Sequence, residues 1–140
     1  MLKRSRRNGF TLIELLLVLV ILAVLAAVVV PKFTNRSEQA RLTAARTDIH
    51  ILEGALDQFE IDCGHYPTSD EGLGALLQPP PNVQNWHGAY IKGGQIPKDP
   101  WGNPYIYRFP GVHNANQYDL YSFGPDGREG NDDIDNWSGH

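Results

Sequence analysis

One apolar block limits what this chain can fold into more than any other feature of its sequence. Residues 15–30 are sixteen consecutive apolar residues, and the apolar stretch from Phe10 to Val30 is 21 residues long, interrupted only by Thr11 and Glu14. A helix rises about 1.5 Å per residue, so this stretch reaches roughly 30 Å, the thickness of a bilayer's hydrocarbon core. We therefore expect residues 10–33 to form a membrane-spanning helix.

Basic residues are concentrated ahead of the block. Four of the 12 Lys and Arg residues lie among the first nine positions, at Lys3, Arg4, Arg6 and Arg7. This density of positive charge predicts a cytoplasmic N-terminus and places the chain from residue 31 onward on the far side of the membrane. A basic start followed by an apolar run also describes a cleaved secretory signal, but residues 31–36 offer no small-residue cleavage pattern. We therefore expect the apolar segment to remain in the mature protein.

The rest of the chain is acidic and nearly free of cysteine. Without the first nine residues, 8 basic residues face 16 acidic ones, and the segment from 109 to 140 has six acids against Arg128 alone. Neutralising phosphates requires a basic face, so this balance argues against nucleic acid as a partner. The single cysteine, Cys63, excludes an intramolecular disulfide framework and a cysteine-based zinc cluster.

Glu14 is the unexpected residue of the apolar segment, because a charged carboxylate in a membrane is costly unless it is paired. One interpretation is that Glu14 lies one turn inside the interface, extends to water and has no role. The other is that it pairs with a cation. If the chain were cut after Gly9, the new α-amino group of Phe10 in a neighbouring subunit would supply that cation and fix the axial register of parallel helices.

The leader carries a family resemblance. The run KRSRRNG, then FTLIELLLVLVILAVLA, resembles the class III leader of type IV pilins and pseudopilins. The resemblance implies that a prepilin peptidase removes residues 1–9 by cutting between Gly9 and Phe10 on the cytoplasmic side. It also implies N-methylation of Phe10, an assembly role for Glu14, and a single-pass anchor in the cell inner membrane.

Beyond Pro31 the pattern becomes amphipathic and then strand-like. Helical spacing predicts a helix over residues 35–62. Its apolar stripe comprises Leu42, Ala45, Ile49, Leu52, Leu56, Phe59 and Cys63. This stripe is expected to pack on the domain's own sheet rather than in a coiled coil. A short helical piece is expected at 72–77, and two antiparallel strands at 105–109 and 118–123. The predicted fold class is α+β, with a globular domain over residues 34–140.

Three blocks of this domain narrow the resemblance. HYPTSDEGLGAL, DPWGNPY and YSFGPDG followed by NDDIDNW are similar to the major pseudopilins of type II secretion systems. The resemblance implies a non-enzymatic subunit of a periplasmic filament that helps drive folded exoproteins across the outer membrane. Its implied partners are further copies of the chain, minor pseudopilins, the prepilin peptidase and the inner-membrane secretion platform.

Two other functions remain open from the sequence. A type IV pilin for adhesion, motility or DNA uptake would share the leader, but commonly closes its C-terminal region with a disulfide that one cysteine cannot form. A membrane-anchored enzyme or calcium-dependent binding module is the alternative from another class. The chain has no G-x-S-x-G motif, P-loop or dinucleotide-binding fingerprint to support catalysis, and its five histidines show no metal-ligand spacing.

Aspartates gather near the C-terminus. Asp126, Asp132, Asp133 and Asp135 lie within ten positions interrupted by glycines. Their repulsion would open the loop unless a cation neutralised it, and calcium accepts carboxylate and carbonyl oxygens in irregular loops. The spacing is not that of an EF-hand, and a solvated acidic turn is the alternative.

The pseudopilin resemblance favours a structural Ca²⁺ in this loop. It implies side-chain ligands from Asp126, Asp132 and Asp133, with carbonyl ligands from Phe123 and Arg128. Asp135 is a weaker candidate, expected to lie behind the direct ligands. The loop is slightly shorter than the family pattern.

Overall fold

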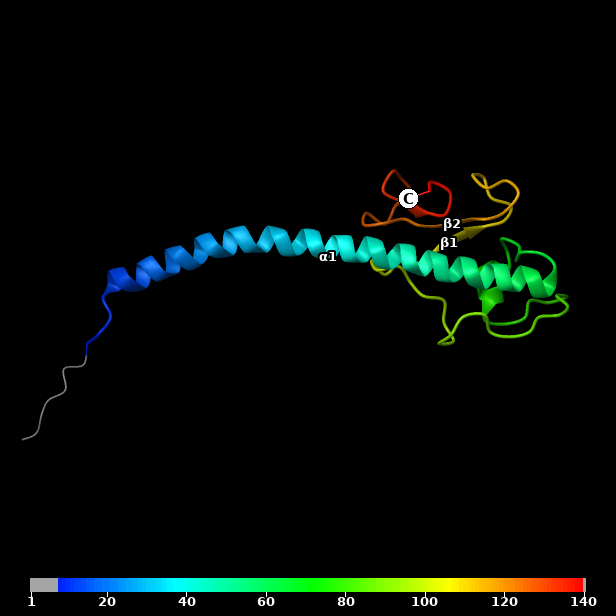
Figure 1. Cartoon of the computed structure of the whole chain (residues 1–140), viewed down its shortest axis with the longest axis horizontal. Coiled ribbons are helices and arrows are strands. Elements are labelled where there is room, and N and C mark those ends of the chain that lie inside the picture. The colour runs from blue at the N-terminus through cyan, green and yellow to red at the C-terminus, as the bar shows by residue number, and fades with distance from the viewer. Residues whose placement is uncertain (1–7, 140) are drawn as a thin grey trace, which may run out of the picture. The chain divides into compact units, whose positions relative to one another are not determined.

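The computed structural model describes residues 8–139, except for the side chains of residues 30–34, and has the predicted α+β class (Figure 1). Its elements are a long helix α1 (Leu12–Cys63), a short 3-10 helix η1 (Gly72–Leu76), and strands β1 (Ile106–Arg108), β2 (Asp119–Ser122) and β3 (Ile134–Asp135). The chain divides into two compact units, Met1–Glu38 and Gln39–His140. Residues 1–7 of the predicted leader, and with them its four basic side chains, lie outside the described residues.

The first unit contains the apolar part of α1. Its window Leu12–Val29 has a mean hydropathy of 3.2, and none of it is buried within the protein. A helix that is apolar on every side requires lipid or other protein around it. The expectation of one helix with the length and composition of a single-pass membrane anchor is therefore confirmed. The helix continues through Pro31.

In the second unit, α1 buries one face against the globular domain. Ala45, Leu52 and Phe59 are fully buried on this face, and Leu42 and Cys63 are half-buried at its ends. The Phe59 ring meets the rings of His65 and Tyr90 edge to face. The prediction that the stripe packs on its own domain is confirmed. Cys63 is less buried than expected, because it lies in the last helical turn.

The sheet has the order β1-β2-β3 with antiparallel neighbours. Tyr107 pairs with Leu120 and Ser122 with Ile134. Both predicted strands are shorter than expected. Beyond Arg108, the Ser69 hydroxyl donates to the Phe109 carbonyl and accepts from the Phe109 N–H, so these groups leave the ladder. The two-residue strand β3 was not predicted, because its segment carries the turn-forming aspartates.

Three tyrosines of the loops and sheet are bonded to aspartates on α1. Their hydroxyls donate over 2.8 to 3.1 Å in the pairs Tyr105 to Asp48, Tyr66 to Asp57 and Tyr90 to Asp62. Burial, together with nearby acids, raises the pKa of Tyr66 and of Tyr90 to about 12. The hydroxyls therefore keep their protons at neutral pH and remain donors to these carboxylates.

Candidate assembly and cation sites

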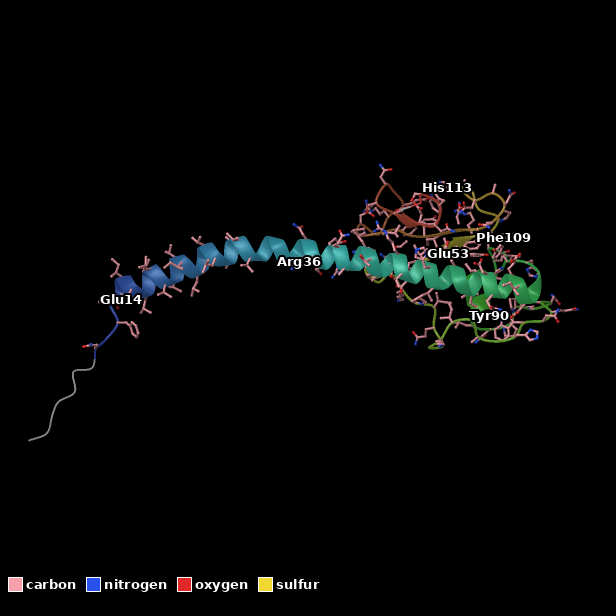
Figure 2. The ribbon with its side chains drawn as sticks, in the orientation of Figure 1. Glu14, Arg36, Glu53, Tyr90, Phe109 and His113 are labelled. Atoms are coloured by element: carbon pink, nitrogen blue, oxygen red, sulfur yellow. The ribbon has the colours of Figure 1, made fainter. Side chains whose placement is uncertain are left out.

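Glu14 lies at the start of α1 (Figure 2), where it forms a reciprocal pair of hydrogen bonds with Thr11. The Thr11 N–H donates to Glu14 Oε2 over 2.9 Å, and the Glu14 N–H donates to Thr11 Oγ1 over 3.3 Å. This is a capping box, which satisfies backbone donors at the first helical turn. The T-x-x-E spacing ahead of an apolar run is its sequence signature, although the cap was not among the features predicted above.

The capping box occupies only part of the Glu14 carboxylate. Oε2 accepts the Thr11 N–H, and Oε1 takes no part in this pair. Glu14 and Phe10 are both exposed, Phe10 with 85% of its surface. One carboxylate can therefore cap its own helix and still accept a hydrogen bond from a cationic group of another chain. Gly9, at the predicted cleavage position, is also exposed.

A second capping box of the same kind lies in the globular domain. The Thr68 N–H donates to Glu71 Oε2 over 2.8 Å, and the Glu71 N–H donates to Thr68 Oγ1 over 3.3 Å. It precedes η1, far from the apolar segment in the sequence. The two boxes have the same pair of hydrogen bonds, but the first caps α1 and the second closes the turn ahead of η1, whose N-cap is Glu71.

The aspartate loop connects β2 to β3 and makes a tight approach at its first glycine. Gly124 has φ +71°, and a methyl group added there would lie 2.5 Å from the carbonyl oxygen of Asp132. Only glycine fits both the conformation and the space. Gly124 and Asp132, eight residues apart in the sequence, therefore lie close together at the two ends of the loop.

The three predicted carboxylate ligands all lie in this loop. Asp126 Oδ1 accepts the Arg128 N–H over 2.8 Å, and Asp133 Oδ1 accepts the Gly130 N–H over 3.1 Å. Asp132 is exposed and accepts no hydrogen bond from another described residue. Within residues 8–139, no three His, Cys, Asp or Glu side chains are grouped closely enough to hold a metal. The structure therefore brings the carboxylates into one loop without assembling them around a single point.

The donor chemistry of the loop nevertheless fits calcium. Asp126 and Asp133 each use one oxygen for a backbone bond and have a second one, and all predicted donors are oxygens, as Ca²⁺ prefers. Asp132 Oδ1 and the Arg128 carbonyl oxygen lie 3.5 and 4.0 Å from the position of a methyl group built on Gly130. A predicted carboxylate and a predicted carbonyl ligand thus flank the same residue. Phe123, the other predicted carbonyl ligand, is half-buried at the start of the loop.

The charges of the loop repel one another. Burial raises the pKa of the Asp133 carboxyl, and the nearby carboxylates of Asp132, Glu129 and Asp126 raise it further, against a lowering by the Gly130 N–H. A carboxyl whose pKa is raised by its neighbours is destabilised in its charged form. A bound divalent cation would remove this repulsion.

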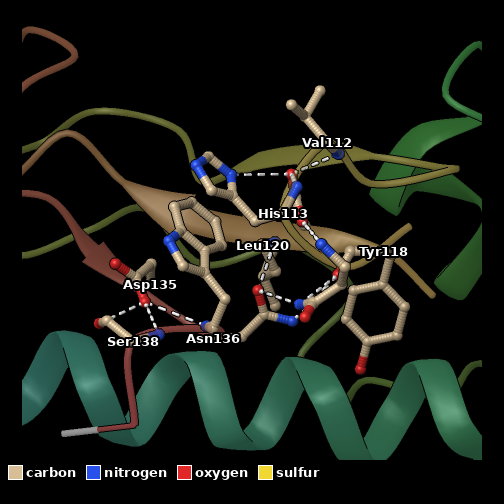
Figure 3. Close-up of polar contacts among 10 residues, drawn as sticks. Val112, His113, Tyr118, Leu120, Asp135, Asn136 and Ser138 are labelled. Carbon is tan, nitrogen blue, oxygen red and sulfur yellow. Dashed lines mark hydrogen bonds and ion pairs between the residues drawn. The ribbon is translucent and has the colours of Figure 1, made fainter. Parts of the chain in front are cut away.

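Asp135 has a different role from the other aspartates (Figure 3). Its Oδ1 accepts the N–H groups of Trp137 and Ser138 and the Ser138 hydroxyl, over 2.6 to 3.0 Å. These bonds close a turn after β3. Asp135 therefore stabilises the turn of the C-terminal segment through Trp137 and Ser138.

Asn136 fastens the same segment to β2 (Figure 3). Its Oδ1 accepts the Leu120 N–H over 3.0 Å, and its Nδ2 donates to the Tyr118 carbonyl over 3.2 Å. The Asn114 side chain also donates to Asn136 Oδ1, over 3.4 Å. This role of Asn136 was not predicted, because a single asparagine forms no recognisable sequence motif.

A buried carboxylate, Asp119, organises the neighbouring loop. It is 2% exposed and accepts the N–H groups of Val112, His113 and Asn114, while His113 Nδ1 lies 3.2 Å from its Oδ2. Burial opposes ionisation of Asp119, but these hydrogen bonds prevail and lower the pKa of its carboxyl. The His113 ring stacks on Trp137, with 4.0 Å between centroids. Sequence reasoning missed Asp119, because it lies inside a predicted strand.

Comparisons with known proteins cover almost the whole chain. Residues 32–137 match the family "Type II secretion system (T2SS), protein G", and residues 4–30 match the "Prokaryotic N-terminal methylation motif". The "Type II secretion system core protein G" of Pseudomonas aeruginosa is 46% identical, over 97% of this chain and 99% of that protein. The protein of the same name from Klebsiella pneumoniae is 45% identical, over 96% of each chain.

A solved structure has the same fold. It is the crystal structure of the major pseudopilin from the type 2 secretion system of enterohaemorrhagic Escherichia coli. It superposes with a TM-score of 0.66 at 35% identity, and the match covers 74% of this chain and 88% of that one.

Proposed function

The chain belongs to the type II secretion system protein G family and is a subunit of the pseudopilus, and we propose that many copies stack into a periplasmic filament that helps drive folded exoproteins across the outer membrane. The observation that carries this proposal is the apolar window Leu12–Val29, of which nothing is buried within the described part of the chain. A segment of this kind stays in lipid or packs against identical segments. The proposed role is mechanical and requires no catalysis.

The N-terminal methylation motif indicates a chain that a prepilin peptidase processes. We propose cleavage between Gly9 and Phe10 at the cytoplasmic face of the inner membrane, with the globular domain in the periplasm. The exposure of both residues supports access by a peptidase. The pseudopilin family assembles with other components of the secretion system. The partners proposed for this chain are other copies of itself, the minor pseudopilins and the inner-membrane platform.

Glu14 is proposed to fix the register between subunits. Its Oε2 caps α1 through Thr11, and Oε1 is placed to accept a hydrogen bond from the methylated amine of Phe10 in a neighbouring subunit. The charge of the amine would offset the cost of a carboxylate among apolar residues. The cap of α1 and the axial register between subunits would then both depend on the Glu14 side chain.

Three variants separate these two roles. Glu14→Ala removes both, whereas Glu14→Gln keeps a cap acceptor but removes the charge. Glu71→Ala breaks the matching capping box of the globular domain and is the control. We expect filament yield and exoprotein secretion to fall strongly for Glu14→Ala and Glu14→Gln and to persist for Glu71→Ala. Normal secretion by Glu14→Gln would reject the charge pairing.

A structural Ca²⁺ is also proposed for the loop between β2 and β3. Asp126, Asp132 and Asp133 would hold it, with the carbonyls of Phe123 and Arg128. Its charge would neutralise the repulsion that raises the pKa of Asp133. The loop would then be fixed next to β3 and the C-terminal turn. We propose that this surface of the subunit contacts neighbouring subunits in the filament.

Thermal unfolding of the full-length chain in detergent micelles tests the cation site. A ligand that binds only the folded state raises its melting temperature, so Ca²⁺ is compared with Mg²⁺ and with a chelator. We expect a rise specific to Ca²⁺ that Asp126→Ala abolishes. Asp70→Ala, which removes an exposed aspartate outside the loop, should keep the rise. Equal melting of the unmodified chain in all three conditions would refute the site.

A further inference from the structure

A buried carboxylate outside the aspartate loop, Asp99, closes a turn that leads into β1. It is 4% exposed, and its Oδ1 accepts the N–H groups of Trp101 and Asn103 over 3.1 and 2.7 Å. Backbone bonds between Asp99 and Asn103, and from Gly102 to Asp99, complete the turn. These bonds leave Oδ2 of Asp99 for a different partner.

That partner is Ser122, the last residue of β2. The Ser122 hydroxyl donates to Asp99 Oδ2 over 2.6 Å, and Ser122 is 0% exposed. The same hydroxyl oxygen accepts the Gly124 N–H over 3.1 Å. Two consecutive hydrogen bonds therefore run from the Asp99 turn to the first glycine of the aspartate loop. Buried hydrogen bonds of this kind hold a fixed geometry, because breaking one leaves a polar group without a partner.

Gly124 in turn lies close to Asp132. A methyl group on Gly124 would lie 2.5 Å from the Asp132 carbonyl oxygen and 3.4 Å from its Oδ2. The Asp99 turn also reaches the loop at a second place, because a methyl group on Gly127 would lie 3.3 Å from Asn103 Nδ2. The turn therefore supports the loop on both sides of Asp126.

We infer that Asp99 and Ser122 are positioning residues for the cation site. They hold Gly124, which lies next to Asp132, so that the two ends of the loop are kept together before the ion arrives. Less conformational entropy is then lost on binding, which raises the affinity. Groups behind metal ligands commonly act in this way. The inference rests on the proposed Ca²⁺ site and explains why a turn more than twenty residues earlier in the sequence belongs to it.

Calcium titration of the full-length chain in detergent micelles, followed by calorimetry, tests the inference. Ser122→Ala removes the bridging hydroxyl. The control is Ser69→Ala, which also removes a bridging hydroxyl. The Ser69 hydroxyl joins the carbonyl and the N–H of Phe109, away from the loop. We expect Ser122→Ala to weaken calcium binding roughly ten- to a hundredfold and Ser69→Ala to leave it unchanged. Ser122→Thr, which keeps the hydroxyl, should recover most of the affinity.

The melting temperature in chelator separates positioning from general stability. Both serine variants are expected to melt earlier in chelator, but only Ser122→Ala should also lose most of the rise that Ca²⁺ produces. Asp99→Asn provides a second variant if Ser122→Ala fails to fold. Calcium affinity that Ser122→Ala leaves intact, or that Ser69→Ala lowers equally, would overturn the positioning role alone. Absence of calcium binding by the unmodified chain would overturn the cation site and this inference together.

Discussion

The two parts of α1 are the same secondary structure held in place by different means. The apolar window Leu12–Val29 has no residue buried within the protein. The part that carries Ala45, Leu52 and Phe59 has a buried stripe and three aspartates bonded to tyrosines of the domain. One part is stabilised by its own chain, and the other depends on whatever surrounds it.

This difference supports the proposal that one subunit occupies two environments, first the lipid bilayer and then the filament. A helical segment that is not buried within the described part of the chain can exchange lipid for other helices without loss of buried contacts. The globular domain keeps its core through the exchange, because its contacts are internal. Substitutions in the two parts should therefore affect different properties, and the predictions that follow test that separation.

The largest difference is expected between two identical substitutions on α1. Leu52 is fully buried, and Leu19 is 66% exposed. Leu52→Ala should destabilise the globular domain by about 2–5 kcal/mol, because it removes a buried side chain and leaves a cavity. Leu19→Ala should leave the unfolding of the domain unchanged. Denaturant unfolding of the full-length chain in micelles measures both, and equal losses would contradict the separation.

Asp119→Asn should destabilise the globular domain by about 1–3 kcal/mol, because an amide cannot accept all the hydrogen bonds that the carboxylate takes. The pKa of Asp119 is lowered in the folded state. The stability it provides is therefore present above the ordinary carboxyl pKa of about 4 and is lost as the pH falls through the lower folded value. The difference between variant and parent should shrink in acid. A difference that is constant with pH would show that Asp119 acts through shape alone.

A smaller effect is expected where α1 begins. Thr11→Val keeps the shape of the side chain but removes the capping oxygen, which typically costs about 1 kcal/mol. The loss should appear as faster amide exchange in the first turn of α1, with no change in the melting of the globular domain. Thr68→Val, in the second capping box, should show the opposite pattern. Slower domain folding or lower melting for Thr11→Val would contradict the independence of the two units.

The smallest effect is expected at Asp133. Its pKa is raised in the folded state, so in chelator the folded protein takes up a proton before the unfolded chain does. Stability should therefore rise as the pH falls from neutral toward the ordinary carboxyl range, opposite in sign to the effect of Asp119. Asp133→Asn should remove this rise. Melting in chelator measures this pH dependence. If parent and variant show the same dependence of stability on pH, the increase in stability belongs to another group.

The sequence predicted those features that depend on periodicity or on a continuous motif. The apolar block, the buried stripe from Leu42 to Cys63, the short helical piece at η1 and the two main strands all follow from spacing and composition. The family resemblance came from the residues around Gly9, Phe10 and Glu14 and from three blocks of the domain. The comparisons confirm it.

Features made by contacts between distant residues could not be predicted. Ser122 looks like an ordinary strand residue until the fold brings it against Asp99. Asn136 acquires its role only where the C-terminal segment meets β2. The predicted end of the first strand at Phe109 was wrong because Ser69, 40 residues away in the sequence, bonds to Phe109. The Thr11 capping box was different, since its spacing was readable from the sequence and was overlooked.

Labelling with a lipid-soluble carbene precursor tests the central claim most directly. Membranes containing the chain are labelled before and after filament assembly, and the modified residues are mapped. We predict that label attaches within Leu12–Val29 while the subunit is in the membrane and is lost from that segment on assembly, with the stripe around Leu52 unlabelled in both states. Label on that stripe, or an unlabelled Leu12–Val29 segment before assembly, would contradict the account.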